Sequence, residues 1–136
     1  MNEMPFNNYL SFNYREDLEI MILRWLKEVN SEQLRHGYEE ALRKAQEFKV
    51  RHWLFDLRGR GPVTKEDENW VTNNFFPRAE AQFQEPNYFA YLVSPSHEQH
   101  FQVNGKVETL NCKTSICRFQ IFTSEQDAVN WLQESQ

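Results

Sequence analysis

The segment Asp56-Leu57-Arg58-Gly59-Arg60-Gly61 holds the residues whose types and spacing best suit chemistry in this sequence. It ends an apolar run, residues 52–57, that is typical of a buried central strand. In open α/β sheets, ligands and partners bind beyond the carboxyl ends of such strands. A carboxylate at the end of a buried strand needs a partner, and Arg58 or the helix start near Thr64 could supply one. The segment predicts either a binding edge or a structural ion pair that holds the loop.

A second polar set is predicted on the helix that follows this loop. Asp67, Asn74 and Arg78 recur at helical spacing on one face, and Trp70 lies beside them. Arg58, Asp67 and Arg78 could form a polar cluster beside the tryptophan ring that recognises an anion or another protein. The alternative is a solvated helix face with a half-buried tryptophan. The binding residues predicted from the sequence are Asp56, Arg58, Asp67, Trp70, Asn74 and Arg78.

The sequence has no recognisable signature of catalysis, cofactor binding or metal binding. The glycines of residues 59–61 match neither a Walker loop nor a dinucleotide-binding fingerprint, and no Gly-x-Ser-x-Gly motif surrounds a serine. His97, His100, Cys112 and Cys117 lack the tight, regular spacing typical of structural zinc sites. We therefore expect no enzyme activity, no cofactor and no metal.

Strands and helices alternate in the predicted element order. Residues 9–14 and 18–25 have the patterns of two strands, and the polar residues between them predict an antiparallel hairpin. An amphipathic helix capped by Asn30 or Ser31 should reach Phe48. The remaining predicted elements are a strand at 52–57, a helix from Thr64 towards Phe83, a strand at 88–93, a short helix near 97–101, a strand at 118–122 and a helix capped by Thr123 or Ser124. Pro77 predicts a kink or an early stop in its helix.

This order predicts one α/β domain spanning residues 1–136. The expected sheet is mixed and mostly parallel, with four or five strands, an N-terminal antiparallel hairpin and crossover helices. A chain of 136 residues has the size of one domain, and its 15% aromatic residues can fill a dense core. Residues 94–116 are the hardest part to interpret.

Composition also limits the classes of binding partner and the cellular compartment that we expect. The net charge of −5 argues against broad electrostatic binding to nucleic acid or to an anionic membrane. No segment approaches the ~18 apolar residues of a membrane span, and the first residues do not read as a secretory signal. Two cysteines do not suggest a disulfide framework, so we expect a reducing, cytoplasmic setting.

Several segments, together with the element order, resemble one known family. They are His-Trp-Leu-Phe-Asp-Leu-Arg (52–58), Glu-Asp-Glu-Asn-Trp (66–70), Phe-Phe-Pro-Arg-Ala (75–79), Tyr-Phe-Ala-Tyr-Leu-Val-Ser (88–94) and Phe-Thr-Ser-Glu-Gln-Asp-Ala-Val-Asn-Trp-Leu (122–132). The chain is similar, over nearly its whole length, to small bacterial STAS-like proteins, also called anti-sigma-factor-antagonist-like. These proteins are related in fold to lipid-binding CRAL-TRIO domains.

The resemblance implies a sheet with surrounding helices that serves protein–protein regulation. In regulatory STAS proteins, a partner kinase phosphorylates a Ser or Thr just after the central strand. Here residues 56–59 contain no hydroxyl residue, and the nearest candidate, Thr64, already has a capping role. The sequence therefore departs from the family pattern at the phosphorylation switch.

Three functions follow as hypotheses. The favoured one is a non-enzymatic regulatory or protein-interaction module with an unidentified protein partner. The second is a small-molecule or lipid carrier, in which aromatic residues line a pocket for a small apolar ligand, although 136 residues leave little room for a large cavity. The third, an enzyme, rests only on the polar residues at the sheet edge. A homodimer through the hairpin edge or the Trp70 face is a further prediction.

Overall fold

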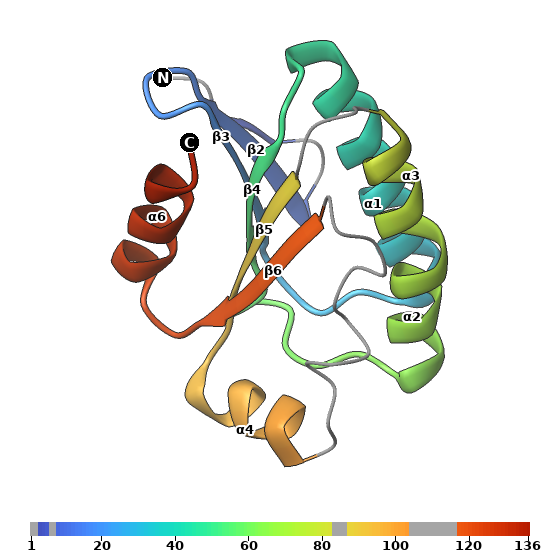
Figure 1. Ribbon diagram of the computed structural model, residues 1–136. Helices are drawn as coiled ribbons and strands as arrows, with labels where there is room; N and C mark the ends of the chain where they lie inside the picture. The colour runs from blue at the N-terminus through green and yellow to red at the C-terminus, as the bar shows by residue number, and fades with distance from the viewer. Residues whose placement is uncertain (1–2, 6–7, 83–86, 104–116) are drawn as a thin grey trace.

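The computed structural model describes residues 3–5, 8–82, 87–103 and 117–136, and it shows one mixed sheet between two layers of helices (Figure 1). The strands are β1 (Glu3–Pro5), β2 (Leu10–Arg15), β3 (Ile20–Trp25), β4 (His52–Asp56), β5 (Asn87–Leu92) and β6 (Cys117–Phe122). The helical elements are α1 (Ser31–Phe48), α2 (Lys65–Trp70), η1 (Val71–Phe75), α3 (Phe76–Gln82), α4 (Pro95–Val103) and α6 (Glu125–Glu134). The predicted α/β class is confirmed.

The strands lie in the sheet in the order in which they occur in the chain, from β1 to β6. β1, β2 and β3 pair antiparallel, and β3, β4, β5 and β6 pair parallel. The short strand β1 was not predicted from the sequence. It pairs with the outer side of β2, so β1, and not the predicted hairpin, forms that edge of the sheet.

The two faces of the sheet are covered by different helices. α1, α2 and α3 lie on one side and α6 lies on the other, while α4 lies beyond the carboxyl end of β5 (Figure 1). Side chains of a strand alternate between faces. In β4, Trp53 and Phe55 therefore join the core under α1, and Leu54 joins the core under α6. The central strand is buried on both faces, as its apolar sequence predicts.

Aromatic rings fill the core under α1. Tyr38 of α1 stacks on Phe55 with ring centroids 5.5 Å apart and meets Phe75 at 4.8 Å. Phe75 in turn meets Trp53 at 5.6 Å and Phe89 at 5.9 Å. The aromatic residues that the lipid-carrier hypothesis places around a ligand here pack against one another, and their contacts stabilise the domain.

The helix after β4 departs from the prediction at its middle. It begins at Thr64, whose hydroxyl caps it as expected by accepting from the backbone N–H of Asp67 at 3.1 Å. It continues past Pro77 to Gln82, and the change of geometry comes earlier, in the π-helical turn η1. Proline has no N–H to donate to the carbonyl four residues before it, and that carbonyl lies within η1. The irregularity thus precedes Pro77.

Candidate functional site

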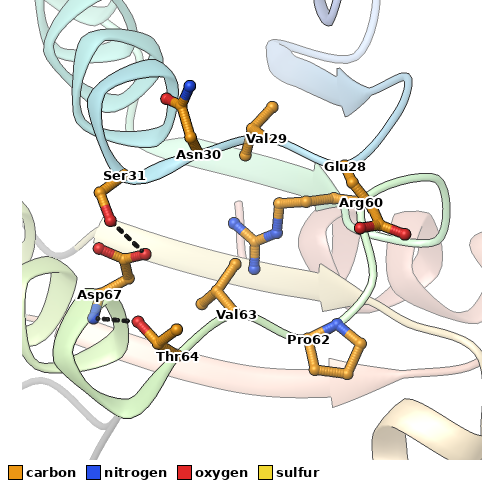
Figure 2. A pocket seen from close by; sticks show the side chains of 9 residues that line it. All are labelled: Glu28, Val29, Asn30, Ser31, Arg60, Pro62, Val63, Thr64 and Asp67. Atoms are coloured by element: carbon orange, nitrogen blue, oxygen red, sulfur yellow. Dashed lines mark hydrogen bonds between the residues drawn. The ribbon is translucent and has the colours of Figure 1, made fainter.

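A pocket of about 460 Å³ opens between the loops that follow β3 and β4 (Figure 2). These strands are parallel neighbours, so their carboxyl ends meet at the same edge of the sheet. One loop leads into α1 and the other into α2, and the N-terminal residues of both helices form part of the wall. The lining residues are Glu28, Val29, Asn30, Ser31, Arg60, Pro62, Val63, Thr64 and Asp67.

Gly59 allows the two loops to approach each other closely. A Cβ atom at this position would lie 2.4 Å from the backbone oxygen of Trp25 and 3.2 Å from the backbone of Leu26. The turn is then closed by the N–H groups of Arg60 and Gly61, which donate to the oxygen of Leu57 at 3.1 and 2.8 Å. This turn directs the side chain of Arg60 back over the end of β3.

Arg60 is the most unusual side chain of the pocket. It is only 6% exposed, and its guanidinium lies over the ring of Trp25 at 5.4 Å. Its Nε donates to the oxygen of Gly61 at 3.2 Å, while its Nη1 is buried and has no hydrogen-bond partner in the described part of the chain. Figure 2 shows the guanidinium pointing into the middle of the pocket. No carboxylate among the described residues lies within 4.0 Å to balance its charge.

Asp67 presents the opposite charge from the other side of the pocket. It is 5% exposed, and one carboxylate oxygen, Oδ2, accepts from the hydroxyl of Ser31 at 2.9 Å. Its other oxygen, Oδ1, is buried without a hydrogen-bond partner among the residues that the structure describes. Asp67 and Arg60 face each other in Figure 2 but are not within ion-pair distance. Two buried, opposite charges therefore share one pocket without neutralising each other.

Behind Arg60 lies a much smaller space of about 10 Å³. That volume corresponds to about one water molecule. The hydroxyl groups of Tyr38 and Tyr91 are hydrogen-bonded at 3.0 Å beside it, and burial raises the pKa of Tyr91. The Tyr91 phenol therefore supplies no negative charge to Arg60 near neutral pH, and the carboxylate of Glu68 also lines this space.

A second set of charged residues lies at the same carboxyl edge of the sheet, on the face that α6 covers. Asp56 accepts from Nη1 of Arg24 at 2.7 Å and from Nε and Nη2 of Arg58, both at 3.0 Å. Glu125, in the first turn of α6, accepts two further bonds from Arg24, both at 3.0 Å. We call these four residues, Arg24, Asp56, Arg58 and Glu125, the ion cluster.

The ion cluster holds its carboxylates in the charged form. Burial alone would raise the pKa of Asp56, but hydrogen bonds from Arg58 and Arg24 outweigh burial and bring this pKa below its ordinary value. The hydrogen bond from Arg24 lowers the pKa of Glu125 as well, and the bond to Glu125 raises the pKa of Arg24. Each charge in the cluster thus has an opposite charge beside it.

The structure separates the residues that the sequence analysis grouped together. Asp56 and Arg58 meet as expected, but they do so on the α6 face. Asp67 lies in the pocket on the opposite side of the sheet. Trp70 packs against Tyr38 at 6.4 Å, within the layer of α1. The single recognition face around Arg58 and Trp70 therefore does not form, because the alternation of β4 sends Asp56 to the α6 side.

Asn74 and Arg78 lie away from the pocket. Arg78 donates to both carboxylate oxygens of Glu39, at 2.6 and 2.7 Å, and Asn74 donates to the oxygen of Trp70 at 3.1 Å. The π-helical turn η1 contains Asn74 and precedes Arg78. It changes the helical phase after Asp67, so a spacing of 3.6 residues per turn predicts the wrong face for both residues. Arg60 was not among the predicted binding residues, yet it supplies the guanidinium facing Asp67 that Arg78 was expected to supply.

Comparison with known proteins shows no family for this chain. No protein-family model matches the sequence, and no curated protein matches it. Among the described residues there is no group of three metal-ligating side chains; of the residues considered above for zinc, Cys112 and the side chains of His100 and Cys117 lie outside the described part. None of the helices in the described part is long and apolar enough to cross a membrane. The pocket itself is therefore the feature from which a function can be inferred.

Proposed function

We propose that this chain is a non-enzymatic regulatory or protein-interaction module of STAS-like type that acts in the cytoplasm and binds at the carboxyl edge of its sheet. The observation that carries the proposal is the pair of buried charges in the pocket, Arg60 and Asp67, which form no ion pair among the described residues and each keep one buried polar atom without a hydrogen-bond partner there. Proteins satisfy buried charges wherever stability alone decides, and they depart from that rule at functional sites. The ion cluster at the same edge shows the satisfied arrangement.

The rim of the pocket supports a protein partner. Leu26, at 49% exposure, is the exposed large hydrophobic residue of the described chain, and its backbone lies beside Gly59. An exposed apolar residue next to desolvated charged groups has the composition of a small interaction hot spot. The favoured partner is a protein that covers Leu26 and reaches into the pocket.

The roles of the two hydroxyl groups in the pocket favour binding over catalysis. Thr64 caps α2, and the hydroxyl of Ser31 donates a hydrogen bond to the carboxylate of Asp67. A serine nucleophile is usually activated by a histidine base that a third group orients. Here the hydroxyl groups support the helix starts and Asp67, which is a structural role.

Site-specific photo-crosslinking in native cells tests the partner. A photo-reactive amino acid at Leu26 is expected to give one defined adduct, and that adduct should fall at least tenfold when Arg60 is replaced by methionine. The same amino acid at Gln133, an exposed position on α6, is the matched control. Equal adducts from both positions, or adducts at Leu26 that do not depend on Arg60, would reject the proposal.

A second candidate function, a carrier of a small molecule, is supported by the size of the pocket. Its volume of about 460 Å³ lies within the range of about 300–1,000 Å³ that small-molecule sites occupy. Charged and hydroxyl side chains line much of it, which favours a polar ligand over a lipid. Native mass spectrometry of gently purified protein should show an added mass of a small polar compound, and an added mass of lipid size would contradict this form of the hypothesis.

A further inference from the structure

We propose that the pocket between α1 and α2 binds a small zwitterion of the amino acid type, with its carboxylate at Arg60 and its ammonium group at Asp67. The inference deepens the small-molecule form of the proposed function, because it names the ligand class of the same pocket. It does not require a protein partner. Three features of the site lead to it: the buried cation without an ion pair among the described residues, the buried anion opposite it that likewise has none, and the mixed lining between them.

Arg60 supplies the carboxylate end of the site. Its guanidinium is oriented by the ring of Trp25 and by the oxygen of Gly61, so little freedom remains to be lost when a ligand binds. The planar fork of a guanidinium matches the two oxygens of a carboxylate. Because Arg60 is 6% exposed, only a group that enters the pocket can reach it.

Asp67 supplies the ammonium end. Ser31 holds one of its oxygens, which leaves Oδ1 as a fixed acceptor without a donor in the described part of the chain. A simple anion bound at Arg60 would leave this carboxylate uncompensated and would be repelled by it. A zwitterion places a positive group there instead, so that Arg60 and Asp67 each receive an opposite charge from the ligand.

The lining between the two charges fits the rest of such a ligand. Val29, Val63 and Pro62 form apolar parts of the wall, and the capped N-terminal end of α1 at Asn30 adds a partial positive charge (Figure 2). Side chains of small or medium size can lie on the apolar residues while the charged groups face Arg60 and Asp67. The site is therefore expected to prefer an aliphatic amino acid to a longer charged one.

Titration calorimetry on the purified chain tests this inference. The twenty common amino acids are screened first by thermal shift, and L-valine is then compared with two fragments of itself. 3-Methylbutanoate lacks the ammonium group and 2-methylpropylamine lacks the carboxylate. L-valine, or the aliphatic amino acid that the screen favours, should bind at least tenfold more tightly than either of its fragments. If no amino acid binds, or if the carboxylate fragment binds equally well, the inference is wrong.

Variants at each end assign the roles. Arg60→Lys keeps the charge but loses the fork, and it should weaken amino acid binding at least tenfold; Arg60→Met should abolish it. Asp67→Asn should weaken the amino acid at least tenfold and leave the carboxylate fragment unchanged or tighter. Arg15→Met, at an exposed ion pair on the β2–β3 hairpin, is the control and should bind as the original chain does. Unchanged binding in Arg60→Met overturns the assignment, while thermal unfolding verifies that each variant is folded.

Photo-crosslinking and calorimetry test the two proposals independently of each other. A chain that binds L-valine but gives no adduct at Leu26 would retain the zwitterion site and lose the protein partner. A chain that forms the adduct but binds no amino acid would retain the partner, with a side chain of that partner as the occupant of the pocket.

Discussion

Arg58 and Arg60 stand two residues apart in one loop, yet they lie in opposite electrostatic surroundings. Arg58 has a side chain that is 46% exposed and still bonds to two carboxylates, those of Asp56 and Glu125. Arg60 is 6% exposed and bonds to no carboxylate among the described residues. Solvent could stabilise the first charge unaided, whereas the second has lost most of its water. Arg60, which is more buried and needs a counter-charge more than Arg58 does, is therefore the residue that has no ion pair among the described residues.

The difference separates a structural group of charges from a binding group. In the ion cluster, attraction between the residues has lowered the carboxylate pKa values and joined β3, β4 and α6. In the pocket, Arg60 and Asp67 are held apart by the elements that carry them, so their attraction remains available to a ligand. Variants that remove a charge should therefore have opposite effects on stability in the two places.

The largest effect is expected when the ion cluster loses its central carboxylate. Asp56→Ala leaves Arg24 without its buried partner and removes the acceptor that anchors the Arg58 backbone. Breaking such a pair should lower the free energy of unfolding by about 3 kcal/mol. Chemical denaturation measures the loss. A loss as small as that of Arg15→Met, an exposed pair, would show that the cluster does not hold the strands together.

The loop between the two groups should be the next most sensitive part. In Gly59→Ala the added Cβ would meet the backbone oxygen of Trp25 at 2.4 Å, and a backbone atom cannot turn aside as a side chain can. We expect a loss of about 2 kcal/mol from this overpacking. Gly61→Ala is the matched control, since it has open space but a φ of 75°, and it should cost about 1 kcal/mol. If Gly61→Ala were the more damaging variant, the close approach of the loops would be wrong.

Sequence patterns predicted the scaffold of this edge well. The apolar run of β4, the cap Thr64 and the amphipathic pattern of α1 all depend on neighbours in the chain, which a sequence displays directly. Of the two caps considered for α1, Asn30 and Ser31, the structure has Asn30. For the same reason Arg58 was one of the two partners considered for Asp56, the other being the helix start near Thr64, and the structure pairs Asp56 with Arg58. Arg24, at the far end of β3, could be paired with Asp56 only once the parallel register of the strands was known.

The pocket could not be predicted from the same patterns. Arg60 was not among the predicted binding residues, because nothing in its sequence neighbours shows that the turn closed on Leu57 directs it over Trp25. Asn74 and Arg78 were misplaced because η1 interrupts the helical repeat that their spacing assumed. A glycine on each side of Arg60 was the available signal, since such a turn can bring a side chain back against the preceding strand.

Removing the charge of Arg60 should have the opposite sign from removing that of Asp56. Methionine has a similar reach and can still pack on the ring of Trp25, so Arg60→Met loses an uncompensated charge and little contact area. We expect the free energy of unfolding to rise by about 1 kcal/mol. Arg58→Met, in the ion cluster, should instead lower it by up to about 1 kcal/mol because its pairs are partly exposed. A destabilised Arg60→Met would mean that Arg60 serves the fold.

The smallest effect concerns acid stability, and it belongs to the ion cluster. The pKa values of Asp56 and Glu125 are lower in the folded chain than in the unfolded one, so protonation favours unfolding. Their contribution is complete above the ordinary carboxyl pKa of about 4 and is lost as the pH falls through the lower, folded values. Arg24→Met removes the main bonds that lower the pKa of Glu125 and one of the bonds that lower the pKa of Asp56. The unfolding temperature of this variant should therefore fall less steeply with decreasing pH below the ordinary carboxyl pKa of about 4. Arg60→Met should keep the original slope. Thermal unfolding across that range compares the two variants, and an equal change of slope in both would remove the distinction between the cluster and the pocket.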